Sequence, residues 1–195
     1  MSSLLHRLLT APAALAVKRP VKDALWTLRG MTMSAVEIPP DARDVLFVCH
    51  GNICRSPFAE RLARRLFEDR GDFEFQSVGV HAWPGSEPPA HAVAAALPFG
   101  VDLRSHRSRA IDTPALLAAD LVVGMEPWHG SVIGRRFPKL AKPCVLLSEF
   151  EETATRRGGY LRYNVPDPYG RDMRSFEECF ARMESCLRGL RARLT

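Results

Sequence analysis

The feature that most constrains the fold is an apolar strand pattern that leads through a short glycine-containing loop into a helix. The segment reads DVLFVCHGNICRSPFAE, residues 44–60. An unbroken apolar run such as VLFVC is typical of a strand buried on both faces of a parallel sheet. Ser56 and Pro57 suit a helix start, because proline tolerates a first-turn position whose N–H would have no intrahelical partner. The segment therefore predicts a buried strand, a tight loop and a helix in direct succession.

The rest of the chain repeats this alternation. Strands are predicted at residues 45–49, 73–80, 120–125 and 142–147. Helices are predicted at residues 56–70, 90–97, 126–137 and 175–194. Strands that alternate with helices are typical of a parallel sheet with helices on both of its faces. We therefore predict a three-layer αβα domain around a four-stranded parallel sheet.

Residues 1–40 differ from the remainder, and we predict a helical extension and linker there, followed by a single domain at residues 41–195. The longest uncharged apolar run, Leu8 to Val17, is too short to span a bilayer. The segment has the general shape of a signal peptide, but its cleavage pattern is poor. No transmembrane segment is expected. The favoured interpretation is a helix that packs on the body, a partner or a membrane surface.

Composition narrows the functional class. The 27 basic and 22 acidic residues give a formal net charge of +5, and the basic residues are spread over predicted helices. Nucleic-acid binding is therefore not expected.

The cysteines are odd in number and irregular in spacing, which argues against a secreted disulfide framework. A zinc site would need a second close ligand pair beside Cys49 and Cys54, so we expect no metal and a reducing, cytoplasmic setting. The five cysteines are Cys49, Cys54, Cys144, Cys179 and Cys186.

The loop after the first strand has the character of an anion site. Backbone N–H groups of such a loop converge, and the start of the following helix adds partial positive charge. Gly51 and Asn52 accept backbone conformations that most residues resist. The spacing matches neither the Walker loop nor the glycine pattern of a dinucleotide fold. The predicted occupant is a phosphate-like dianion.

Cys49 and Arg55 stand at the two ends of this loop. A thiol near a helix N-terminus and an arginine readily forms the nucleophilic thiolate, and Ser56 is expected to donate a hydrogen bond to it. A guanidinium can hold two phosphoryl oxygens at once. The leaving group needs an acid, and NVPDPYG offers Asp167 between two prolines. Taken alone, Asp-Pro indicates a turn; beside the cysteine loop, it is the candidate acid.

Two motifs resemble one known family. VCHGNICRSP resembles the signature of the low-molecular-weight protein tyrosine phosphatases, and VPDPYG resembles their general-acid loop. Weaker similarities at QSVGV, GVDLRSHRSRAI and DLVVGME lie between these motifs in the same order, so the resemblance spans about residues 44–192. It implies that family's fold and cofactor-independent hydrolysis of phosphotyrosine in proteins.

The resemblance also implies roles for individual residues. Cys49 would attack phosphorus and form a phosphocysteine intermediate, while Asp167 would protonate the leaving oxygen and later act as base. Arg55 and the loop amides would hold the phosphoryl oxygens. Support for the loop would come from Ser77 and His106. The implied phosphate-binding positions are His50, Gly51, Asn52, Ile53, Cys54 and Ser56.

Specificity is expected to depend on the rim of the pocket. Tyr169 and Trp83 are candidates to flank an aromatic leaving group, although each could equally be a packing residue. Related arginine phosphatases carry threonine at the position of Ile53, so isoleucine favours phosphotyrosine. Cys54 could guard Cys49 by forming a reversible disulfide, or it could simply be buried.

Three alternatives remain open from the sequence. One is a protein-arginine phosphatase on the same scaffold. Another is an arsenate reductase, which is disfavoured because no cysteine lies between Cys54 and Cys144. The third is a phosphate-dependent binding protein, against which the intact Cys/Arg/Asp set argues. The expected partners are phosphotyrosine-containing proteins and, by analogy with bacterial relatives, a tyrosine kinase of surface-polysaccharide export.

Overall fold

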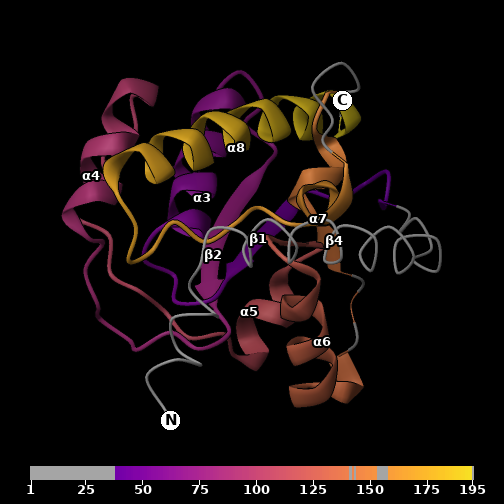
Figure 1. The fold of residues 1–195 in the computed structure, drawn as a ribbon. Helices are drawn as coiled ribbons and strands as arrows, with labels where there is room; N and C mark the ends of the chain where they lie inside the picture. Colours follow the sequence, from indigo (N-terminus) through magenta and orange to yellow (C-terminus); the bar gives the residue numbers. More distant parts are fainter. Residues whose placement is uncertain (1–37, 141, 143, 153–157, 195) are drawn as a thin grey trace, which may run out of the picture.

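The computed structural model describes residues 38–140, 142, 144–152 and 158–194. Nearly all of the predicted extension at residues 1–40 lies outside these ranges. The described part contains the predicted four-stranded parallel sheet, with strand order β2-β1-β3-β4 (Figure 1). The strands are β1 Asp44–Cys49, β2 Glu74–Gly79, β3 Leu121–Gly124 and β4 Cys144–Leu146.

Helices cover both faces of this sheet, which confirms the predicted three-layer arrangement. In Figure 1, α3, α4 and α8 lie on one side of the sheet, and α5 and α6 lie on the other. The helices are α3 Arg55–Leu66, α4 Ala90–Ala96, α5 Thr113–Ala118, α6 Pro127–Arg136, α7 Gly159–Tyr163 and α8 Met173–Leu194. Short 3-10 turns occupy Leu97–Phe99, Pro138–Leu140 and Leu147–Phe150.

The central strand β1 is buried on both faces, because its side chains alternate between two cores. Phe47 belongs to the larger core, which includes Phe58 of α3 and Phe180 of α8. The rings of Phe58 and Phe180 stack with their centroids 3.9 Å apart. Val48 points into the smaller core with residues of α5 and α6. This double burial explains why the sequence of β1 is an unbroken apolar run.

Helix α3 ends earlier than predicted, so the expectation of helix up to Arg70 is wrong. The chain leaves the helix at Phe67, whose side chain is buried against the rings of Phe73 and Phe75 at 4.8 and 5.0 Å. The N–H of Arg70 bonds to the carbonyl of Phe67 in a tight turn. The helix therefore ends where Phe67 is buried in an aromatic cluster, although the charged residues that follow continue the helical pattern in the sequence.

Helix α8 is tied to the segment that leads into the predicted acid loop. The buried guanidinium of Arg182 forms an ion pair with Glu151, Nε to Oε1 at 3.0 Å. The same guanidinium donates to the carbonyl of Asn164 at 2.6 Å and to that of Leu161. Removing one partner of such a buried pair is costly, since the other charge would stay desolvated. The segment that precedes Asp167 in the chain is thus held against the core.

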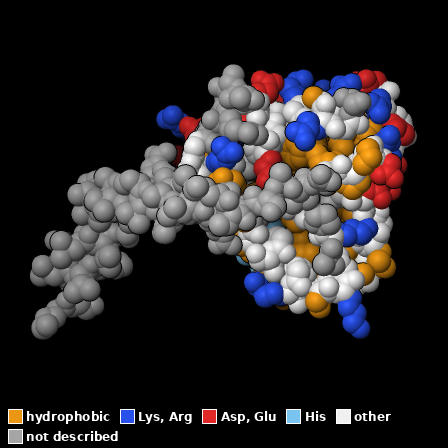
Figure 2. Space-filling model, turned by 90° about the vertical axis from the view of Figure 1, so that its right-hand side faces the viewer, with side chains coloured by type: hydrophobic (Ala, Val, Ile, Leu, Met, Phe, Trp, Pro, Cys, Tyr) orange, Lys and Arg blue, Asp and Glu red, His pale blue; other side chains and the backbone are white. Residues whose placement is uncertain are grey.

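On the face shown in Figure 2, basic side chains alternate with acidic and uncharged ones. Within the described ranges, no helix has both the length and the apolar character needed to cross a membrane.

Candidate active site

The loop between β1 and α3 lies where the carboxyl ends of β1, β2 and β3 meet. Strand β1 pairs with β2 on one side and with β3 on the other. The strand order changes direction at this point, which is where open parallel sheets bind ligands. Residues from both neighbouring strand ends can therefore reach the loop.

Asn52 fixes the shape of the loop. Its backbone has a positive φ of 54°, a left-handed conformation that asparagine tolerates better than most residues. Its side-chain amide donates to Ser56 Oγ at 2.9 Å and to Ser77 Oγ at 3.0 Å. Its side-chain oxygen accepts a hydrogen bond from the backbone N–H of Arg109 at 2.7 Å. Asn52 thus joins the loop to helix α3, strand β2 and the segment before α5.

A histidine supports the same residue from outside. His106 Nε2 lies 2.8 Å from the backbone carbonyl of Asn52. Since a carbonyl only accepts, Nε2 carries the proton in this contact. Burial lowers the pKa of His106, although the bond to Asn52 and the nearby charge of Glu60 oppose that shift. Ser77 donates to Glu60 in turn. The predicted support residues Ser77 and His106 therefore both contact the loop asparagine.

Gly79, the last residue of β2, allows the loop to lie directly on the sheet. A Cβ atom at this position would stand 2.7 Å from the carbonyl oxygen of His50 and 2.9 Å from the N–H nitrogen of Asn52. Both contacts are with backbone atoms and are too short for a carbon atom. Any side chain here would displace the loop.

The thiol of Cys49 lies at the base of the loop and is 2% exposed. Its Sγ is 3.0 Å from Ser56 Oγ and 3.3 Å from the donating N–H of Asn52. The Ser56 hydroxyl has a single proton, which can go to Sγ or to the carbonyl of Val78 at 3.2 Å. Ser56 can therefore donate to Sγ when the Val78 carbonyl does not take that proton.

Arg55 is buried and is bound by two carboxylates. Its Nη1 donates to Glu126 Oε1 at 2.7 Å and to the carbonyl of Val165 at 2.8 Å, and its Nη2 donates to Asp167 Oδ2 at 2.5 Å. Burial opposes its charge, but the negative charges of Asp167, Cys49 and Glu126 prevail and raise the pKa of Arg55. The guanidinium is therefore both charged and fixed in direction.

Glu126 is a site residue that the sequence did not reveal. It is the residue before α6, where its backbone N–H donates to His129 Nδ1 at 3.0 Å in a capping box. His129 is fully buried, and burial together with the charge of Arg55 lowers its pKa to about 2. Nδ1 accepts, so Nε2 of this neutral ring carries the proton, and it has no hydrogen-bond partner among the described residues. In the sequence, Glu126 read only as a helix start.

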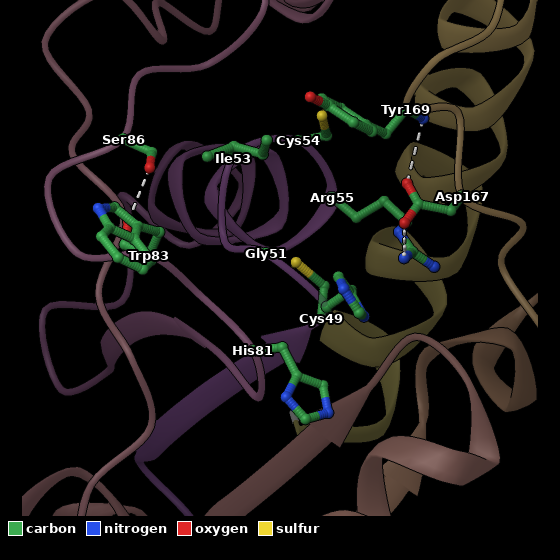
Figure 3. A pocket seen from close by; sticks show the side chains of 11 residues that line it. Cys49, Gly51, Ile53, Cys54, Arg55, His81, Trp83, Ser86, Asp167 and Tyr169 are labelled. Atoms are coloured by element: carbon green, nitrogen blue, oxygen red, sulfur yellow. Dashed lines mark hydrogen bonds and ion pairs between the residues drawn. The ribbon is translucent and has the colours of Figure 1, made fainter.

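The candidate acid Asp167 faces the candidate nucleophile across a cavity of about 220 Å³ (Figure 3). Asp167 Oδ1 accepts a hydrogen bond from the backbone N–H of Tyr169 at 3.2 Å, and its other oxygen binds Arg55. The carboxylate is thus oriented from both sides. The cavity is lined by Cys49, His50, Gly51, Ile53, Cys54, Arg55, His81, Trp83, Ser86, Asp167 and Tyr169.

The rim of this cavity contains both predicted aromatic residues. Trp83 is 83% exposed and Tyr169 is 61% exposed, so neither side chain is needed to fill the core. Cys54 lines the same cavity, and burial raises the pKa of its thiol. His81 and Ser86 also line it without having been predicted. Across the described ranges, no three His, Cys, Asp or Glu side chains are grouped as a metal ion would require.

Comparison with known proteins decides the family. The profile described as "Low molecular weight phosphotyrosine protein phosphatase" matches residues 44–195. The chain belongs to this family. A low molecular weight protein-tyrosine-phosphatase of Streptomyces coelicolor is 37% identical over 158 residues, which cover 76% of this chain and 91% of that protein. The family assignment therefore agrees with the resemblance found in the sequence.

Other members of the family differ in their named activity. A protein-arginine-phosphatase of Bacillus subtilis is 32% identical over 152 residues, covering 77% of this chain and 96% of the relative. The tyrosine phosphatase Wzb from Escherichia coli K30, solved in complex with sulphate, superposes with a TM-score of 0.69 at 27% identity, covering 79% of this chain and 99% of Wzb. The family thus includes phosphatases named for tyrosine and for arginine.

Proposed function

We propose that this protein hydrolyses phosphotyrosine in proteins through a phosphocysteine intermediate. The observation that carries the proposal is the arrangement around one cavity of a loop thiol, a buried arginine and a loop carboxylate: Cys49, Arg55 and Asp167. A nucleophile, a charge clamp and a proton donor are the groups that cleavage of a phosphate monoester requires.

In the first step, the Cys49 thiolate attacks phosphorus, and the bond between phosphorus and the tyrosine oxygen breaks. Asp167, carrying a proton, donates it to that oxygen. Arg55 and the loop N–H groups hold the three remaining phosphoryl oxygens, where charge develops. Oxygens of the substrate replace Asp167 as the partner of Arg55 Nη2, which releases the carboxyl group for proton transfer.

In the second step, water attacks the phosphorus of the phosphocysteine. Asp167, now ionised, takes a proton from that water, the bond between sulfur and phosphorus breaks, and the Cys49 thiolate leaves. Ser56 Oγ, 3.0 Å from Sγ, stabilises this leaving thiolate with its proton. Inorganic phosphate then departs, and the starting state is restored.

A phosphotyrosine substrate is favoured by the wall and rim of the cavity. Ile53 presents an apolar side chain to it, and Trp83 and Tyr169 provide exposed aromatic surface at its mouth. An apolar wall and an aromatic rim give a phenyl ring surfaces to pack against. The arginine phosphatase activity named for the Bacillus subtilis relative is the second candidate, since that relative covers most of this chain.

The decisive test is side-by-side turnover of a phosphotyrosine peptide, a phosphoarginine peptide and arsenate by the wild type and by Cys49→Ser. We expect the highest kcat/KM for phosphotyrosine and loss of that turnover in the variant. A higher kcat/KM for phosphoarginine would establish the second candidate. Hydrolysis of phosphotyrosine by Cys49→Ser at the wild-type rate would overturn the covalent mechanism.

Further parts of the proposal concern the setting of the enzyme. We place it in the cytoplasm, where thiols stay reduced, and assign Cys54 the role of trapping oxidised Cys49 as a disulfide. A tyrosine kinase of surface-polysaccharide export is the proposed partner, by the analogy with bacterial relatives that the sequence suggested. Residues 1–40 are proposed as a separate segment that docks on a partner or membrane surface. Deleting residues 1–32 should change distribution in the cell or activity on protein substrates.

A further inference from the structure

Two histidines and a tryptophan lie together beside the nucleophile. His50 directly follows β1, His81 lies two residues after the end of β2, and Trp128 belongs to the first turn of α6. The centroids of the His50 and His81 rings are 5.3 Å apart. The Trp128 ring lies 5.4 Å from His50 and 6.0 Å from His81, and it is stacked on the latter at 17°. Three elements thus converge on one small surface.

This cluster opens onto the catalytic cavity. His50 and His81 are exposed and line the cavity. Figure 3 shows His81 on the opposite side of Cys49 from Ile53 and Cys54. Trp128 is only partly exposed, and its other neighbour is the buried ring of His129 at 4.3 Å. The tryptophan therefore forms a fixed wall, against which the two imidazoles are held.

The polar groups of the cluster are not engaged elsewhere in the part of the chain that the structure describes. No described residue forms a hydrogen bond with either the His50 or the His81 ring. The positive forms of two imidazoles held side by side would repel each other. An anionic group placed between them would remove that repulsion and satisfy their N–H donors.

The surrounding charges also favour an anion. Arg136 of α6 donates to the carbonyl of Val80, the neighbour of His81, at 3.4 Å. The nearby carboxylates Glu126 and Asp167 share one cation, Arg55, which offsets one of their two negative charges. Glu87, which directly follows the cavity residue Ser86, is paired with Arg107. His129 carries no charge at neutral pH, since burial lowers its pKa to about 2. A carboxylate beside His50 and His81 would therefore meet imidazole N–H donors and the nearby guanidinium of Arg136.

We propose that His50, His81 and Trp128 form a subsite for an Asp or Glu side chain that lies next to the phosphorylated tyrosine in the protein substrate. This proposal rests on the proposed phosphotyrosine activity and names the substrate class of that same cavity. The carboxylate accepts hydrogen bonds from the two imidazoles, while its aliphatic part packs on the indole. His50 adjoins Cys49, so the acidic residue must be close to the phosphotyrosine in the sequence of the substrate.

The test uses pairs of phosphotyrosine peptides that differ by Glu or Gln at one position within two residues of the phosphotyrosine. For at least one position, we expect a kcat/KM ratio of Glu to Gln peptide of about three- to fivefold at pH 7, typical of an exposed ion pair. His81→Gln should bring this ratio to near one. His91→Gln, which changes an exposed histidine of α4 outside the cavity, should leave the ratio at its wild-type value.

The possible outcomes separate the two proposals. Equal kcat/KM for Glu and Gln peptides at every position, with both hydrolysed, would overturn the carboxylate subsite and leave the phosphatase activity intact. A preference that persists unchanged in His81→Gln would also overturn it. Failure to hydrolyse any phosphotyrosine peptide, with turnover of phosphoarginine, would refute the proposed function itself.

Discussion

Replacing Asn52 with alanine tests the claim that this residue fixes the phosphate loop. The substitution removes three side-chain hydrogen bonds, to Ser56, Ser77 and the N–H of Arg109. At about 1 kcal/mol net for each bond, the loss is about 3 kcal/mol. Alanine must also adopt the positive φ of 54°, which adds about 1 kcal/mol. We therefore expect Asn52→Ala to lower the free energy of unfolding by about 4 kcal/mol.

The glycine variant separates the two contributions. Asn52→Gly loses the same three hydrogen bonds but accepts the left-handed backbone without strain. Part of this advantage is offset by the greater freedom of glycine in the unfolded chain. It should therefore be more stable than Asn52→Ala by about 0.5 kcal/mol. Both variants should lose activity toward an aryl phosphate, because the N–H groups of the loop would no longer converge.

The assay is urea unfolding of the wild type and the two variants under identical conditions. With a denaturant slope of about 2 kcal/mol per molar urea, the midpoint of Asn52→Ala should fall by about 2 M. A fall of less than about 0.5 M would refute the hydrogen-bond argument. Equal midpoints for the alanine and glycine variants would refute the argument from backbone strain. Circular dichroism before denaturation provides the control that each variant is folded.

Three further predictions concern single side chains. Asp167→Asn should lower kcat/KM about 100-fold for phosphotyrosine but far less for an aryl phosphate whose leaving group needs no proton; equal losses would contradict its role as acid. Glu126→Ala removes the side-chain acceptor of Arg55 Nη1 and should lower kcat/KM for phosphotyrosine about tenfold because the guanidinium is then less well oriented, whereas an unchanged kcat/KM would contradict its role in positioning Arg55. The free energy of unfolding should fall by about 2 kcal/mol between pH 7 and pH 5 because of His129. Its pKa is about 2 in the folded protein and about 6.5 in an unfolded chain. At pH 5 the unfolded chain therefore binds a proton that the folded protein does not, which favours unfolding. His129→Gln should lose most of that difference in urea unfolding, and equal pH dependence in the two proteins would contradict this assignment.

The sequence predicted what depends on local pattern. The apolar run at 45–49, the loop and the helix start after it correspond to β1, Cys49–Arg55 and α3. Strand burial and a proline in the first helical turn leave signals within a few residues. The long helix predicted at residues 175–194 is α8, because its apolar residues recur at helical spacing. Short elements such as α5 and α7 carry too few residues for such a period.

The rest of the site depends on which strands are neighbours. Glu126 meets Arg55 because β3 lies beside β1, although the two residues are 71 positions apart in the chain. His81 and Trp128 meet His50 for the same reason. Each of these residues has an ordinary local interpretation as a loop or helix-start residue. Only strand order, which the sequence alone left open, makes them part of the site.

The close fit between Gly79 and the backbone of the phosphate loop has a consequence for protein engineering. The shape of the loop depends on another part of the chain, because the backbone of His50 and Asn52 lies directly against Gly79 at the end of β2. Transplanting residues 44–66 onto a foreign sheet would carry the thiol and the arginine but not this supporting strand end. A successful transplant would also need a glycine at the neighbouring strand end and a backbone N–H in the place of that of Arg109. The smallest transferable unit of the proposed phosphate site is therefore discontinuous in sequence.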